Sequence, residues 1–303
     1  MVSIEPGRDT LLHLETSEGP LDAPAVVVCT GAYQTPYRPA AAAAFPESVL
    51  VLDATQYRNP DQLPPGRVLV VGSGQTGVQL AEELHLANRD PVLACGRAPW
   101  APRRIGGRDV VTVLTEAGFY DQPRSALPSP RARLVANVQA TGAGGGHDLH
   151  YRVLQDLGVA LSGGLDAVAD GVVRFAGDLA DSVAFGDAMY EDMRRLVRDQ
   201  LGSVADHLPD PEPFRCTPIE SIPVSSLGAV ILTAGFRPDY RGWVRMPVFD
   251  NLGFPVVDDD LTTAAPGLYF CGVHFLRTRR SSLLFGVGRD AATVAAAVAA
   301  GLE

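Results

Sequence analysis

A glycine-rich turn between an apolar run and an amphipathic segment is the feature that most constrains this chain of 303 residues. The segment from residue 68 to 77 reads V-L-V-V-G-S-G-Q-T-G, which places G-x-G-x-x-G at Gly72, Gly74 and Gly77. The apolar run 68–71 predicts a buried strand, and residues 75–87 predict a helix with one apolar face. A strand before this motif and a helix after it predict a Rossmann-like α/β unit with a parallel sheet.

Each glycine of the motif has its own physical role. Gly72 permits the tight turn, Gly74 lets the backbone approach a pyrophosphate, and Gly77 lets the helix pack closely on the strand. The N–H groups at the helix start and the helix dipole then favour phosphate oxygens. The alternative is a strand–helix turn with no ligand. The prediction is a dinucleotide site made by Gly72, Ser73, Gly74, Gln75, Thr76 and Gly77.

The end of the next predicted strand, residues 92–95, indicates which dinucleotide binds. An NAD site places a carboxylate about 20 residues past the motif to bind the ribose hydroxyls. This chain reads Cys95-Gly96-Arg97 instead. Arg97, helped by Arg103 or Arg104, can make charge-assisted contacts with a 2′-phosphate. We therefore predict NADPH; the alternative is that these arginines belong to a solvated loop.

Composition excludes several other classes of function. The net charge is −10, so a nucleic-acid partner is not expected. No apolar run reaches the roughly 18 residues of a membrane span, and no signal peptide is visible, which predicts a cytoplasmic protein without a membrane partner. The four cysteines form no CxxC pair, so neither a metal site nor a redox dithiol is predicted. The sequence indicates no oligomeric state.

Further motifs occur in a fixed order along the chain. They are VVVCTGAYQTPYRP from residue 26, QYRNP from 56, GRAPWAPRR from 96, GGGHDL from 144, VILTAGFRPD from 230, GLYFCGVHF from 267 and SSLLFGVGRDA from 281. On these motifs the chain resembles flavin-containing monooxygenase-like proteins. More narrowly, it resembles the bacterial flavoproteins often labelled as involved in potassium transport.

The resemblance implies an NADP-binding domain inserted in an FAD-binding domain. Such proteins use NADPH to reduce FAD, which then activates oxygen. Because the cofactor carries that chemistry, no side chain is predicted to be catalytic. The resemblance implies that the flavin borders Gly31, Gly272, His274, Ser282 and Gly286.

The same resemblance implies a division of the chain. Residues 1–35 would be a remnant of the FAD domain, and residues 36–66 a linker. Residues 67–240 would form the NADPH domain, with an insertion at 100–225. Residues 241–303 would return to the FAD domain and end in a helix, and the strands at 26–29 and 268–271 are expected to pair.

Two departures from the family bear on activity. The family opens with another G-x-G-x-x-G for FAD, and no such motif precedes residue 72. We therefore expect a sequence that starts too late or a degenerate fragment, with only a partial FAD-binding fold and poor FAD binding. In addition, Asp53 stands where the family's monooxygenase signature carries a histidine.

The favoured function is an NADPH- and FAD-dependent oxidoreductase, of monooxygenase type, acting on a small organic substrate. Two alternatives stay open. One is a non-catalytic NADP-binding module or relic of such a flavoprotein. The other is a pyridine-nucleotide dehydrogenase without flavin, for which the sequence shows no Tyr-Lys or His-Asp pair.

Overall fold

The computed structural model describes residues 1–135 and 137–302, and the chain forms two compact units. The first unit comprises Met1–Thr35, Gly118–Leu134 and Phe236–Glu303. The second comprises Pro36–Ala117 and Val135–Gly235, and so lies within the first unit in sequence. The predicted α/β class, with a Rossmann-like domain inserted in another, is confirmed.

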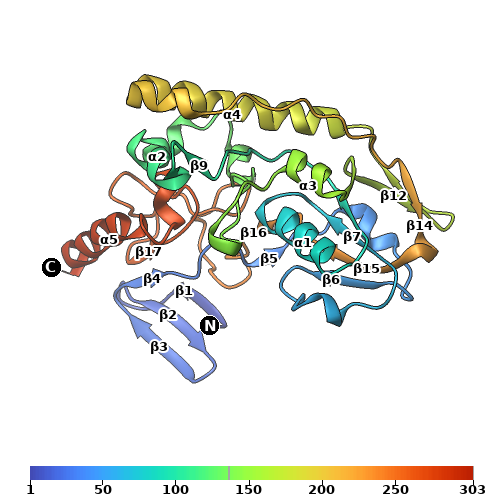
Figure 1. The fold of residues 1–303 in the computed structure, drawn as a ribbon. Coiled ribbons are helices and arrows are strands. Elements are labelled where there is room, and N and C mark those ends of the chain that lie inside the picture. Colours follow the sequence, from blue (N-terminus) through green and yellow to red (C-terminus); the bar gives the residue numbers. More distant parts are fainter. Residues whose placement is uncertain (136, 303) are drawn as a thin grey trace. The chain divides into compact units, whose positions relative to one another are not determined.

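The second unit is built on a five-stranded sheet in the order β11-β8-β7-β15-β6, in which every pair is parallel. Its strands are β6 (Leu50–Asp53), β7 (Arg67–Val71), β8 (Pro91–Ala94), β11 (Ala160–Ser162) and β15 (Leu227–Leu232). Apart from Arg67, Asp53 and Ser162 at strand ends, these runs are apolar, as strands covered on both faces require. In Figure 1 the neighbouring strands β7, β15 and β6 can be followed beside α1.

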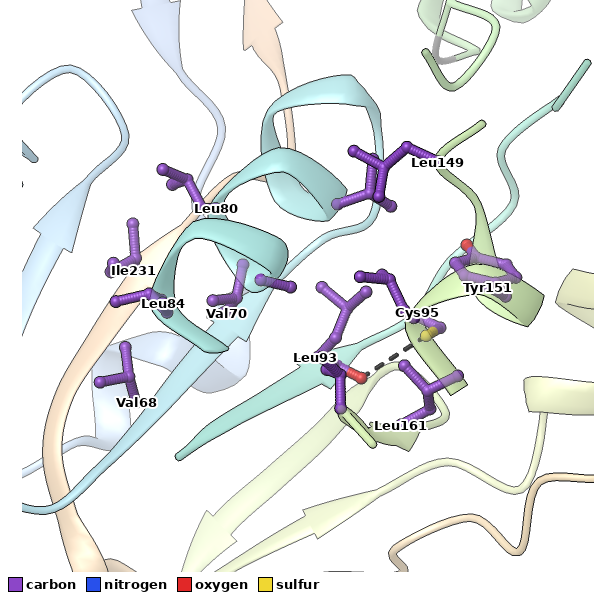
Figure 2. Packing of buried hydrophobic residues seen from close by; sticks show 14 of the residues in the cluster. Val68, Val70, Leu80, Leu84, Leu93, Cys95, Leu149, Tyr151, Leu161 and Ile231 are labelled. Atoms are coloured by element: carbon purple, nitrogen blue, oxygen red, sulfur yellow. Dashed lines mark hydrogen bonds between the residues drawn. The ribbon is translucent and has the colours of Figure 1, made fainter. Parts of the chain in front are cut away.

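Helix α1 (Gln75–Leu86) links β7 to β8 and packs on this sheet. Its fully buried Val78, Ala81 and Leu84 recur at helical spacing. Figure 2 shows Leu84 lying close to Val68, Val70 and Ile231 of the sheet. The predicted apolar face of the helix is therefore the face that forms the core.

The other elements of the second unit lie before β7 and between β8 and β15. The longer helical elements among them are η1 (Ala40–Ala44), α2 (Val110–Glu116), α3 (Tyr151–Leu157) and α4 (Leu179–Leu201). One hairpin pairs β9 (Arg104–Ile105) with β10 (Arg108–Asp109). A separate antiparallel sheet joins β12 (Leu165–Ala169), β13 (Val172–Phe175) and β14 (Ser221–Pro223).

The first unit contains an antiparallel meander and a pair of parallel strands. The meander joins β1 (Ser3–Pro6), β2 (Leu12–Thr16) and β3 (Gly19–Ala23). Strand β4 (Val26–Val28) pairs in parallel with β17 (Leu268–Phe270), as expected from the sequence. The unit ends in α5 (Val287–Leu302). The short strand β5 (Thr35–Pro36), which spans the boundary of the two units in sequence, pairs with β16 (Phe236–Arg237).

The boundaries differ from the expected division in two places. The stretch 36–66, expected to be a linker, contains β6, which pairs with β15 over four residues. Residues Gly118–Leu134, expected within the insertion, belong to the first unit. Both differences arise from contacts that are remote in sequence, which local composition does not encode.

Two further observations concern the cysteines and the length of the apolar helices. Cys95 and Cys271 are buried, whereas Cys29 is exposed. Among the described residues, no helix has both the length and the apolar character that a bilayer span requires.

Candidate dinucleotide-binding site

The glycine-rich turn lies where the order of the sheet reverses. From β7 the chain proceeds through α1 to β8 and then β11 on one side, while β15 pairs with the other side of β7. Ligands of open parallel sheets bind at the carboxyl ends of the strands at such a switch point. The turn after β7 occupies that position.

The glycines of the turn are required by close backbone contacts. Gly72 has φ +106°, and a Cβ there would lie 2.8 Å from backbone atoms of Thr233 and Ala234. A Cβ on Gly77 would lie 1.9 Å from the carbonyl oxygen of Gly72. The helix therefore sits against the turn as closely as a side-chain-free residue allows. On the β15 side of the turn, Thr233 Oγ1 donates a hydrogen bond to the carbonyl oxygen of Gly72 at 2.6 Å.

The start of α1 is free of side-chain caps. Gly74 is the N-cap residue in an extended conformation, and no side-chain hydrogen bond caps the helix. The first N–H groups of a helix have no partner within the helix. Thr76 is exposed in this first turn. The geometry can therefore present backbone donors, with the positive end of the helix dipole, to an anion.

The Ser73 side chain turns inward, away from the open side of the turn. Its hydroxyl accepts from the Gly96 N–H at 2.7 Å and also contacts the hydroxyl of Tyr151. Tyr151 in turn donates to the Gly96 carbonyl. Burial raises the pKa of Tyr151 far above its ordinary value, so this hydroxyl stays protonated. The expected role of Ser73 as a ligand contact is thus limited to its backbone.

A segment remote in sequence covers the start of α1. Gln75 Nε2 donates to the carbonyl of Val138, and Gln79 Nε2 to the carbonyl of Ala140, each at 2.8 Å. In the opposite direction, Gln139 Nε2 donates to the carbonyl of Ser73 at 2.7 Å. The predicted site residue Gln75 therefore uses its amide to hold this segment in place.

The three arginines considered for the 2′-phosphate differ in their surroundings. Arg97 follows Gly96 at the end of β8, is exposed, and makes no ion pair or side-chain hydrogen bond within the described residues. Arg104 is also exposed, and its guanidinium donates only to the carbonyl of Gly145, at 3.3 Å. Arg103 pairs with both carboxylate oxygens of Asp109, at 3.0 and 2.7 Å. Arg97 and Arg104 are therefore available to a phosphate, whereas Arg103 already has a counter-ion.

The glycine-rich loop before α3 is anchored to α1. His147 Nε2 lies 2.6 Å from the Glu82 carboxylate, which is buried on α1. Gly144, Gly145 and Gly146 all have positive φ, so this loop adopts a path that side chains disfavour. The anchor fixes the loop beside the helix whose first turn forms the candidate site.

A buried aromatic cluster lies farther along the insertion. The His150 ring packs on Trp100 at 4.6 Å between centroids, and Trp100 stacks on Tyr190 at 4.1 Å. Arg152 closes the cluster with a bidentate pair to Asp187. Burial lowers the pKa of His150 to about 4, so this ring is neutral near pH 7.

Acidification is expected to destabilise the fold through His150. Its folded-state pKa lies below the ordinary 6.5. The unfolded chain therefore binds the proton first, and stability falls as the pH drops from about 6.5 towards 4. Between pH 7 and pH 5 this effect amounts to about 2 kcal/mol. Urea unfolding of the wild type and of His150→Phe at both values should show a smaller acid loss in the variant, and an equal loss would contradict the assignment.

The residues expected to border a flavin lie in the first unit. Gly31 and Gly272 follow the parallel neighbours β4 and β17, and both have positive φ. The two turns thus occupy the same end of this strand pair. A Cβ on Gly31 would meet nothing within 4 Å, so the space beside that turn is open.

His274 lies just beyond the second of these turns. It is buried, and its Nδ1 lies 3.4 Å from the hydroxyl of Ser282. Burial first, and the nearby Arg279 and Arg133 next, lower the pKa of His274 to about 4. The structure therefore brings His274 and Ser282 together. Gly286 is a packing position instead, because a Cβ there would lie 2.5 Å from the Arg280 carbonyl oxygen.

Asp53, at the end of β6, has a structural partner. Arg38 donates to its two carboxylate oxygens at 3.0 and 2.7 Å. A histidine at this position could not neutralise Arg38 in the same way. Asp53, which stands where the family signature carries a histidine, is therefore paired with Arg38 within the second unit.

Sequence reasoning missed three residues that shape the candidate site: Thr233, Gln139 and Tyr151. Each lies outside the glycine-rich motif and acts on it through a single side chain. Thr233 had a sequence signal, since it ends the apolar run 229–233 just before Gly235. Gln139 and Tyr151 carried none, because their contacts depend on how the insertion folds back.

Comparisons with known proteins identify relatives of this chain. Residues 18–130 match the family model described as flavin-binding monooxygenase-like. An uncharacterized CzcO-like oxidoreductase of Geobacillus kaustophilus (strain HTA426) is 27% identical over 286 residues, which are 94% of this chain and 67% of that protein.

Solved structures show the same fold. A flavin-containing monooxygenase from Stenotrophomonas maltophilia aligns with a TM-score of 0.59 and 16% identity, over 100% of this chain and 70% of its own. L-lysine 6-monooxygenase from Pseudomonas syringae aligns with a TM-score of 0.53 and 16% identity, over 99% of this chain and 70% of its own. The resemblance to flavin-containing monooxygenase-like proteins that the motifs indicated is confirmed by these matches.

Proposed function

Because the chain is related to the flavin-binding monooxygenase-like proteins, we propose that it acts as an NADPH- and FAD-dependent oxidoreductase of monooxygenase type on a small organic substrate. The second unit would bind NADPH at the turn after β7. The first unit would contribute residues to the flavin site. The chemistry on the substrate would be supplied by the bound flavin rather than by a side chain.

One observation carries the proposal. At the switch point of a parallel sheet, Gly72 and Gly77 exclude any Cβ while an uncapped helix begins at Gln75. A Ser, Asp or Asn cap at position 74 would stabilise the helix by only about a few tenths of a kcal/mol more than glycine does, and its side chain would occupy the space at the helix start. The glycine there instead supports close approach of a pyrophosphate.

The choice of NADPH over NADH rests on Arg97 and Arg104. Both are exposed, and neither has a carboxylate partner within the described residues. No acidic residue occurs in residues 95–108, directly after β8, where an NAD site requires one. A 2′-phosphate would supply the counter-ion that Arg97 lacks.

The proposed flavin contacts are Gly31, Gly272, His274 and Ser282. The open space beside Gly31 fits the close approach of a planar ring. The neutral His274 can donate or accept one hydrogen bond at Nε2, the ring nitrogen that does not face Ser282. Gly286 would act through packing, by keeping the segment after Ser282 close to Arg280.

The test is an anaerobic titration of the purified chain supplemented with FAD. Flavin absorbance near 450 nm should bleach on addition of NADPH, and more slowly with NADH. Binding of NADPH without any bleaching would favour a non-catalytic NADP-binding module. Absence of NADPH binding in calorimetry would contradict the proposal as a whole.

A further inference from the structure

We infer that Tyr151 is a positioning residue for NADPH discrimination, acting through Arg97; this rests on the proposed function of the second unit. Tyr151 lies at the first position of α3 and is buried. It is far in sequence from both the glycine-rich motif and Arg97. Figure 2 shows its ring beside Cys95, at the end of β8.

Three hydrogen bonds form a closed ring at this point. The Gly96 N–H donates to Ser73 Oγ at 2.7 Å, and Tyr151 donates to the Gly96 carbonyl. The Ser73 and Tyr151 hydroxyls are hydrogen-bonded to each other, and because the Tyr151 proton goes to the carbonyl, the Ser73 hydroxyl is the donor between them. In this arrangement the Gly96 N–H and both hydroxyl groups each have an acceptor, so every donor of the ring forms a hydrogen bond. Both polar groups of Gly96 are thereby held by side chains.

The held residue directly precedes Arg97. Gly96 has no Cβ and no side-chain packing of its own, and a Cβ there would meet nothing within 4 Å. Its backbone would therefore be free to rotate without the ring. Since Arg97 has no partner within the described residues, the backbone before it is what sets the direction in which its guanidinium extends.

Two further hydrogen bonds hold the pyrophosphate turn. The Gly72 N–H donates to the Ala94 carbonyl at 3.0 Å, and Gln139 holds the carbonyl of Ser73. Loss of the Tyr151 hydroxyl should therefore leave this turn in place. Only the contribution of the 2′-phosphate to NADPH affinity should fall.

The experiment measures NADPH and NADH affinities of Tyr151→Phe by calorimetry. NADPH should bind about 5- to 10-fold more weakly, the size of one lost hydrogen bond between neutral groups, while NADH should change less than about 2-fold. In an Arg97→Ala background, Tyr151→Phe should have no further effect on NADPH. Ser73→Ala removes the other hydroxyl of the ring and should reproduce the result if Tyr151→Phe folds poorly.

Tyr190→Phe is the matched control. Tyr190 is equally buried in the second unit, and its hydroxyl donates to the carbonyl of Pro209 at 2.9 Å. It should leave both affinities unchanged. Equal losses for NADPH and NADH, or an undiminished effect of Tyr151→Phe in the Arg97→Ala background, would overturn the inference. A wild type that binds neither nucleotide would overturn the proposed function, and this inference with it.

Discussion

Gly77→Ala is expected to abolish NADPH binding and to lower the free energy of unfolding by about 3 kcal/mol. The new methyl group would lie 1.9 Å from the carbonyl oxygen of Gly72 and 3.0 Å from Thr233 Oγ1. Neither neighbour is a flexible side-chain end that could yield at little cost. The helix must therefore move away from β7, which carries its first N–H groups away from the pyrophosphate position.

The measurement combines urea unfolding with an NADPH titration. Gly177→Ala is the control, because Gly177 is exposed and a Cβ there would meet nothing within 4 Å. It should change neither quantity appreciably. A stable Gly77→Ala protein with wild-type affinity would show that the turn does not hold the dinucleotide.

Arg97→Ala is expected to weaken NADPH binding by about 10- to 100-fold and to change NADH binding little. A hydrogen-bonded contact with a charged group contributes about 1.5–3 kcal/mol, and 1.4 kcal/mol is a factor of ten in affinity. Only NADPH carries the 2′-phosphate that would meet this guanidinium. The ratio of the two dissociation constants is therefore the informative quantity.

The salt dependence of the same titration adds a second readout. The wild type should lose NADPH affinity as ionic strength rises, and Arg97→Ala should lose less. Arg198→Ala removes the same charge from an exposed position on α4 and should behave as the wild type does. Equal losses for NADPH and NADH in Arg97→Ala would refute recognition of the 2′-phosphate by this residue.

The elements that could be predicted from the sequence are those with strong local signals. The run 68–71, the helix from Gln75 and the apolar run 268–271 each match an element of the structure closely. Their hydrophobic period and their glycines specify them without reference to the rest of the chain. The glycine-rich turn and Arg97 could be predicted from the sequence for the same reason.

The elements that were missed depend on contacts remote in sequence. Strand β6 is short and stands among prolines and turns, and it becomes a strand by pairing with β15. Helix α2 lies in a stretch rich in Pro, Arg and Gly that predicts only loops. Tyr151 likewise gains its role only when α3 is placed beside the end of β8.

The discontinuous first unit constrains the order in which the protein can form during translation. A ribosome that has released β4 must synthesise the whole second unit before β17, the strand that pairs with β4, emerges. At roughly 5–20 residues per second, this leaves β4 waiting for many seconds. The second unit, whose five parallel strands are complete once β15 has been made, can acquire structure first on the nascent chain.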